Sequence, residues 1–375
     1  MMTLTEIVLT VARHANGPLR ITPARIVVTP ATFGLADGDA PAGRYRLSAP
    51  YGWSRRVTAP LEWTLVPDVL DLDRRHALRL EYVSADGAES RDWTVPIRVE
   101  LDLATTFDPE LHAVPFPNRA SAIGDVTPTD ELMRRTYTGL RGALGNALFA
   151  GLYRNIVYLR ADGPTRGGLC TGMARWAIAC AQGKVEQPPT VEEVALFHGR
   201  QLNDRALLAS LSWFLRASPR AAYQAVRDDA LRDGVTRRAL DVAVPKPWRL
   251  DLPRALVQEG HTVVPFRVRQ PSPEVAYLDV YDPNRPPTGD ELNVQTIEFK
   301  LRENRYSYRH LASFEDGRIG MIAAPQSAYA ERSTAYLAAL GSALAVLARR
   351  IPVRRDTSSW TQRDALPGDG SVDTA

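Results

Sequence analysis

The hydrophobic pattern changes its period twice along this chain of 375 residues. Up to about Leu103, short runs alternate between apolar and polar residues and are separated by Gly, Pro and Asp, which is typical of β-strands. Apolar residues then recur mostly at helical spacing over 127–243, and alternating runs return after Pro245. Helices followed by a mostly antiparallel sheet predict an α+β domain, preceded here by an all-β region.

The N-terminal runs predict a β-sandwich of about 100 residues, with Trp53, Trp63 and Trp93 available for its core. Examples of these strands are Arg25–Thr29, Gly43–Leu47 and Val95–Leu101. The expected units of the chain are a β-sandwich over 1–106, a linker over 107–126, the α+β domain over 127–325, a C-terminal helix over 326–351 and a polar, disordered tail over 352–375.

Two helix starts stand out in the α+β region. Thr127 followed by Pro128 predicts an N-cap and a first helical residue, and Thr190 with Glu193 predicts a capping box. From the second start the chain reads as almost wholly helical over 191–243. Strands are expected after it, at His261–Val268, Ala276–Tyr281, Val294–Phe299 and Arg305–Tyr308.

The composition is that of a folded protein, with 45% hydrophobic and 24% charged residues. A formal charge of +3, without a localised basic face, argues against a nucleic-acid partner. With only Cys170 and Cys180 there is no disulfide framework, so a reducing, cytoplasmic location is expected. Glu6 interrupts the first apolar run, and no apolar stretch reaches the length of a membrane span, so neither a signal peptide nor membrane insertion is expected.

Cys170 follows a glycine-rich approach, Arg-Gly-Gly-Leu-Cys-Thr-Gly-Met, that leads into an apolar segment of helical spacing. At a helix start, free N–H groups and the helix dipole favour the thiolate and offer donors to an oxyanion. We therefore interpret Cys170 as a nucleophile, although a free cysteine is most often a small buried hydrophobe, the role expected of Cys180.

A nucleophilic cysteine needs an imidazole within hydrogen-bond reach and a third group that orients the imidazole. His261 begins an expected strand, and Asp282 ends a later one in Val-Tyr-Asp-Pro-Asn. If the two strands pair as a hairpin, His261 lies near Asp282, and Cys170 faces them from its helix. Alone, His261 could equally be a core histidine and Asp282 an ordinary turn residue.

With these elements in this order, residues 125–325 resemble the papain-like cysteine peptidase superfamily, in particular its bacterial C39-like branch. The resemblance implies a helix bearing Cys170 packed on an antiparallel sheet, His261 as general base and acid, and Asp282 as the orienting residue. Papain-like enzymes usually carry a glutamine shortly before the cysteine as an oxyanion donor, but 161–169 contain none. Thr165, Arg166 and Asn155 are the alternative donors to the oxyanion, unless the backbone N–H of Cys170 acts alone. Gly168 is a further candidate for a contact to the oxyanion or substrate.

Three functions fit these residues. The leading hypothesis is a cysteine peptidase or amidase that acts on a peptide or protein through an acyl-thioester, and the second is a transglutaminase-like acyltransferase with the same triad. The third is a catalytically weak papain-like interaction module, with the helical stretch 191–243 and the C-terminal helix as docking surfaces. The N-terminal β domain is expected to offer a surface for a protein partner. No HExxH, CxxC or GxGxxG motif is present, so neither a metal nor a cofactor is expected.

Overall fold

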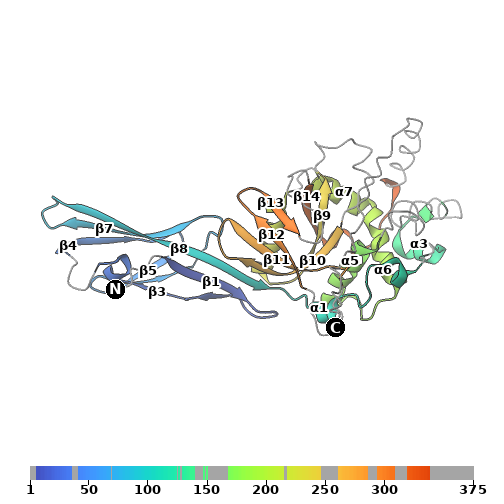
Figure 1. Ribbon diagram of the computed structural model, residues 1–375, viewed down its shortest axis with the longest axis horizontal. Helices are drawn as coiled ribbons and strands as arrows, with labels where there is room; N and C mark the ends of the chain where they lie inside the picture. Colours follow the sequence, from blue (N-terminus) through green and yellow to red (C-terminus); the bar gives the residue numbers. More distant parts are fainter. Residues whose placement is uncertain are drawn as a thin grey trace, which may run out of the picture.

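The computed structural model has a mixed α+β architecture in which strands at both ends of the chain share one large sheet. The N-terminal strands lie at one end of an elongated molecule, and the helices cluster at the other (Figure 1). The structure describes residues 6–35, 41–68, 70–124, 126, 129–139, 147, 149–150, 168–214, 218–245, 261–285, 294–308 and 319–337.

The N-terminal region consists of two packed sheets. Leu9 and Leu80 of the large sheet lie in the same fully buried cluster as Val28 and Leu65 of the small one. Alternation of buried and exposed residues along the strands explains this packing, because successive side chains point to opposite faces. The large sheet contains β1 (Ile7–Arg13), β2 (Arg20–Thr22), β4 (Gly43–Ser48), β7 (His76–Ser84) and β8 (Ser90–Ala104), and the small sheet contains β3 (Ile26–Val28), β5 (Ser54–Ala59) and β6 (Glu62–Val66).

The long strand β8 joins the two ends of the molecule (Figure 1). It pairs in parallel with β1, and its last residues pair antiparallel with β10 (His261–Gln270), with Ala104 opposite Arg267. Eleven of the described strands thus form one sheet that continues across the boundary expected near residue 106.

The segment expected as a linker is packed against the domain that follows it. It contains α1 (Pro109–His112) and α2 (Ala120–Ile123), and Phe107 and Val114 are buried. Asn118, between the two helices, is hydrogen-bonded to residues on two other elements, as described below.

The helices of the second region follow the sequence pattern with two corrections. The predicted N-cap Thr127 is wrong, because Thr129 caps α3 by accepting a hydrogen bond from the Leu132 N–H at 3.1 Å. The capping box of Thr190 and Glu193 is confirmed. The described helices here are α3 (Asp130–Thr136), α5 (Cys170–Ala181), α6 (Val191–Gly199), the 3-10 turn Arg200–Leu202, α7 (Asp204–Phe214) and α8 (Pro219–Arg232).

The helical region predicted over 191–243 extends too far, because Arg238–Pro245 form the strand β9. Its run of apolar residues pairs on both sides, with β10 and with β14 (Ile319–Pro325), and such a buried run cannot be told from a helix by spacing alone. The remaining strands lie where they are expected, as β11 (Val275–Tyr281), β12 (Gln295–Lys300) and β13 (Arg305–Tyr308).

The C-terminal helix expected over 326–351 does not begin at residue 326. Gln326–Ala328 form a single 3-10 turn, an irregular segment follows, and Tyr336 and Leu337 are helical. The remainder of the expected helix from 338 onward and the tail at 352–375 lie outside the described residues. Within the described residues, the helices are too short or too polar to cross a membrane.

Candidate active site

Cys170 is the first residue of α5, as the glycine-rich approach predicts. The helix packs between α6 and strand β10, so its N-terminal end faces the start of that strand (Figure 1). Gly172 permits the contact with α6, because a Cβ there would lie 2.2 Å from the carbonyl oxygen of Val194. Gly172 is therefore a packing residue that lets α5 lie close to α6.

The hairpin between β10 and β11 brings His261 and Asp282 together. Val264 pairs with Tyr281, so Asp282 comes directly after the paired part of β11, beside the first residues of β10. Both side chains are buried, and the His261 Nε2 lies 2.6 Å from the Asp282 Oδ1. The predicted proximity of these two residues is confirmed.

The Asp282 carboxylate has two further donors. The Tyr308 hydroxyl donates to Oδ2 at 2.5 Å, and the Asn284 backbone N–H donates to Oδ1 at 2.8 Å. Burial alone would raise the pKa of Asp282, but the charge and hydrogen bond of His261, with these donors, lower it to about 2. Asp282 is thus ionised at neutral pH and held in one orientation.

Cys170 and His261 polarise one another. Burial alone would raise the pKa of Cys170, but a hydrogen bond to His261, the charge of His261 and the backbone N–H groups of Thr262 and Thr171 lower it below its ordinary value. Burial alone would lower the pKa of His261, but Asp282 and Cys170 raise it to about 10. At neutral pH these shifts favour a thiolate on Cys170 and an imidazolium on His261.

A second chain of polar contacts connects the residues that follow Cys170 and His261. The hydroxyl oxygens of Thr171 and Thr262 are 2.9 Å apart, and Thr262 donates to the Asp241 Oδ1 at 2.9 Å. Since a hydroxyl carries one proton, Thr171 must donate to Thr262. This chain fixes the position of the first turn of α5 relative to β10.

The chain ends at Arg175, a fully buried guanidinium on α5. Its Nη2 is 4.0 Å from the Asp241 Oδ2, its Nη1 donates to the Ala324 carbonyl at 2.9 Å, and its Cζ lies 3.8 Å from the centre of the Tyr329 ring. These contacts compensate the buried cation only in part, because its Nε and Nη2 have no hydrogen-bond partner among the described residues. Arg175 therefore holds α5 against both β9 and β14.

The sequence did not single out Asn118 or Tyr308, although both support the site. The Asn118 Oδ1 accepts from the Leu169 N–H at 2.6 Å, and its Nδ2 donates to the Asn284 Oδ1 at 2.7 Å. One side chain thereby joins the start of α5 to the turn that follows Asp282. No spacing rule marks an asparagine 52 positions before a cysteine; Tyr308 could have been noticed as a polar side chain on a buried position of β13.

The expected oxyanion and substrate contacts have different outcomes. Thr165, Arg166 and Asn155 lie outside the described residues. A Cβ on Gly168 would be 2.3 Å from the Asn118 Nδ2, so this glycine makes room for Asn118 itself. The backbone N–H groups of Thr171 and Thr262 already point at the Cys170 sulfur.

Other residues considered from the sequence do not join this cluster. Cys180, at the far end of α5, is partly buried against apolar neighbours, and burial raises the pKa of its thiol. Among the described residues, no three His, Cys, Asp or Glu side chains gather where they could hold a metal ion.

The site defined by this geometry is a cysteine at a helix start, paired with a histidine and an aspartate from neighbouring strands. Compared with known proteins, the chain matches no family model, and no curated protein or solved structure is significantly similar to it.

Proposed function

We propose that this protein is a cysteine-dependent hydrolase of peptide or amide bonds, with a papain-like arrangement of α5 on β10 and β11. The observation that carries the proposal is the linear set of contacts from Cys170 through His261 to Asp282, with the pKa of the thiol lowered and that of the imidazole raised. A pKa set by specific partners at a partly exposed cysteine is typical of a nucleophile.

The proposed reaction has two halves. The Cys170 thiolate attacks the carbonyl carbon of the scissile bond, and the carbonyl oxygen becomes an oxyanion near the N-terminal end of α5. When the C–N bond breaks, the His261 imidazolium gives its proton to the departing amine, which leaves a thioester on Cys170. Water then attacks the thioester while His261 takes its proton, and the carboxylic acid leaves as the thiolate reforms. Asp282 keeps the imidazole oriented throughout.

Acylation can be tested directly with an activated ester. Incubation with p-nitrophenyl acetate should add one acetyl group to the wild type but none to Cys170→Ala, as read by the intact mass of the chain. Cys180→Ser is the matched control and should be acetylated like the wild type. Equal labelling of Cys170→Ala and the wild type would contradict the assignment of Cys170 as the nucleophile.

Hydrolysis and acyl transfer differ in the molecule that accepts the acyl group from Cys170, which is water in the first and an amine in the second. Peptide mixtures incubated with the wild type should show new N-termini that are missing with Cys170→Ala, if water is the acceptor. Accumulation of amide-linked products only when a primary amine such as cadaverine is added would instead indicate the transglutaminase-like reaction. Absence of both products, with binding partners retained by Cys170→Ala, would favour the interaction module.

A further inference from the structure

The backbone N–H groups at the start of α5 differ in what they contact. The Leu169 N–H donates to the Asn118 Oδ1 at 2.6 Å, and the Gly172 N–H donates to an imidazole nitrogen on α6 at 3.3 Å. The Thr171 N–H points at the Cys170 sulfur. The N–H of Cys170 itself has no acceptor in the part of the chain that the structure describes. This donor is therefore available to an oxygen atom that arrives with a substrate.

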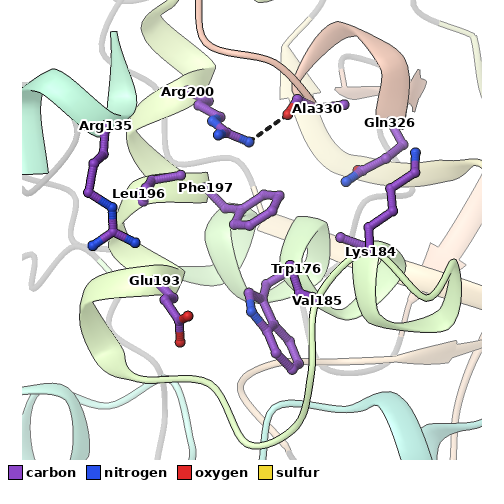
Figure 2. Close-up of a pocket in the computed structure, with 11 residues that line it drawn as sticks. Arg135, Trp176, Lys184, Val185, Glu193, Leu196, Phe197, Arg200, Gln326 and Ala330 are labelled. Carbon is purple, nitrogen blue, oxygen red and sulfur yellow. Dashed lines mark hydrogen bonds between the residues drawn. The ribbon is translucent and has the colours of Figure 1, made fainter.

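The cations on the flank of α5 belong to a separate pocket. Figure 2 shows this pocket of about 300 Å³, which is lined by Trp176, six residues after Cys170 and about 9 Å further along the helix axis. Arg200 there donates to a backbone carbonyl at 2.6 Å, and Arg135 is paired with Glu192 at 3.4 Å. Since these side chains are engaged away from the Cys170 sulfur, a second donor to a substrate oxygen has to come from another element.

Asn118 places a side-chain amide beside the available N–H of Cys170. Its Oδ1 accepts from the N–H of Leu169, the residue directly before Cys170. The backbone of Leu169, with φ −94° and ψ 24°, is close to helical, so the N–H groups of Leu169 and Cys170 point to the same side, out of the N-terminal end of α5. An oxygen held by the Cys170 N–H therefore lies next to the Asn118 amide.

The amide of Asn118 has one proton to spare. The Leu169 N–H requires an acceptor, so it fixes which end of the amide is the oxygen and which is the nitrogen. Nδ2 carries two protons, and one of them is donated to the Asn284 Oδ1 at 2.7 Å. The second proton has no acceptor among the described residues. Asn118 is partly exposed, which leaves this proton within reach of a substrate.

Asn118 is anchored to the turn that carries the carboxylate of the site. Its N–H donates to the Pro283 carbonyl at 3.0 Å, and its side chain donates to Asn284, whose own N–H donates to the Asp282 Oδ1 at 2.8 Å. Gly168 leaves room for the amide, because a Cβ there would lie 2.3 Å from Nδ2. The amide is thus oriented before a substrate binds, which is the condition for effective stabilisation of developing charge.

We propose that Asn118 is a catalytic residue whose Nδ2–H, together with the N–H of Cys170, binds the oxyanion of the reaction. This inference rests on the proposed hydrolase function. When the thiolate attacks, the S–C bond forms and the electron pair of the C=O π bond moves to the oxygen, where the two donors stabilise it. The pair returns to the carbon as the C–N bond breaks and the amine takes the proton of His261. Because the negative charge exists only during the reaction, these hydrogen bonds lower the barrier more than they strengthen substrate binding.

The test compares two reactions of the same sulfur in a Cys180→Ser background. Acetylation by p-nitrophenyl acetate builds negative charge on a carbonyl oxygen, whereas alkylation by iodoacetamide displaces iodide at a saturated carbon and builds none there. For each variant, the rate constant of Cys170 acetylation is divided by that of its alkylation, both followed by the intact mass of the chain. Asn118→Ala should lower this ratio by about tenfold or more, the effect of a lost oxyanion donor.

Two further variants separate the donor from a structural contribution of the side chain. Asn118→Asp keeps an acceptor for the Leu169 N–H but lacks the donor, so the ratio should fall in it as well, even if Asn118→Ala does not fold. Asn304→Ala removes an asparagine that accepts two hydrogen bonds in the turn between β12 and β13, and it should keep the ratio of the wild type.

An equal decrease of both rate constants in Asn118→Ala and Asn118→Asp would overturn the proposal and leave Asn118 with a structural role only. In that case the wild type is still acetylated at Cys170, so the proposed hydrolase function stands. A wild type that is alkylated but not acetylated would instead contradict the hydrolase function, and the role of Asn118 with it.

Discussion

The hydroxyl oxygens of Thr171 and Thr262 are 2.9 Å apart, and each residue directly follows a member of the candidate catalytic pair. The bond joins the first turn of α5 to the start of β10, two elements separated by 91 positions in the sequence. It joins the two backbone segments that carry Cys170 and His261. The position of the candidate site thus depends on neutral side chains as well as on the titrating ones.

Replacement of Thr262 by Val should test this bond. The change keeps the side chain's shape but removes the hydroxyl that joins Thr171 to Asp241. We expect a loss of about 1–3 kcal/mol in the free energy of unfolding, because partly buried polar groups lose their partner. Urea denaturation would measure it. Thr296→Val is the control, because the carboxylate of Asp279, which Thr296 contacts, keeps its ion pair with Arg269. An equal loss of unfolding free energy in both variants would contradict the special role of Thr262.

The alkylation rate of Cys170 should be nearly independent of pH across the neutral range. The thiol pKa is lowered and the His261 pKa is raised to about 10, so the ion pair exists between these two values. In a Cys180→Ser background, iodoacetamide labelling followed by intact mass should already be fast at pH 6. His261→Ala should slow it there at least tenfold, since a thiol near its ordinary pKa of about 8.5 is mostly protonated at this pH.

A rate that rises only above pH 8 in the wild type, and that His261→Ala does not alter, would argue against the thiolate and imidazolium pair. Lys300→Ala, at the exposed end of strand β12, offers a comparison in which the labelling profile should keep its wild-type form.

Tyr308→Phe should make the protein more sensitive to acid. The pKa of Asp282 in the folded protein is about 2, below the ordinary aspartate pKa of about 3.9. The ionised carboxylate therefore stabilises the fold fully above about pH 3.9, and this stabilisation is lost as the pH falls through the folded-state pKa. Loss of the Tyr308 hydroxyl raises the pKa of Asp282, so the stabilisation by the carboxylate is lost at a higher pH. We expect the midpoint of acid unfolding, followed by circular dichroism, to move to higher pH.

At neutral pH the same variant should lose about 1.5–3 kcal/mol, the contribution of a hydrogen bond to a charged group. Tyr277→Phe, on the half-exposed face of β11, is the matched control and should unfold like the wild type. An unchanged acid midpoint in Tyr308→Phe would show that the hydroxyl does not stabilise the carboxylate.

Asn118→Ala should loosen the start of α5. It removes the acceptor of the Leu169 N–H and the donor to Asn284. By analogy with the loss of a helix cap, we expect a destabilisation of about 1–2 kcal/mol, measured by urea denaturation. The rate of Cys170 alkylation should change with it, while Asn304→Ala, in the turn between β12 and β13, should destabilise the chain without changing that rate.

Local chemistry explains why parts of the fold were predictable. The capping box of Thr190 and Glu193 and the alternating runs of β12 and β13 depend on residues close together in the sequence, so their patterns are readable. The same reasoning was wrong for β9, because β9 is a short and mostly apolar run, and periodicity alone does not distinguish such a run from a buried helix. It also misplaced one helix start, at Thr127 in place of Thr129.

The sequence alone determined the three residues of the candidate triad, since a cysteine at a helix start and polar residues at adjacent strand ends are local signals. Only the tertiary structure decided what surrounds them. Tyr308, Asn118 and the chain from Thr171 through Thr262 to Asp241 come from distant segments, and hydrogen bonds of this kind depend on register and packing depth, for which no single segment carries a signal. The continuation of the N-terminal sheet through β8 into β10 was decided in the same way, by pairing between strands more than 150 positions apart.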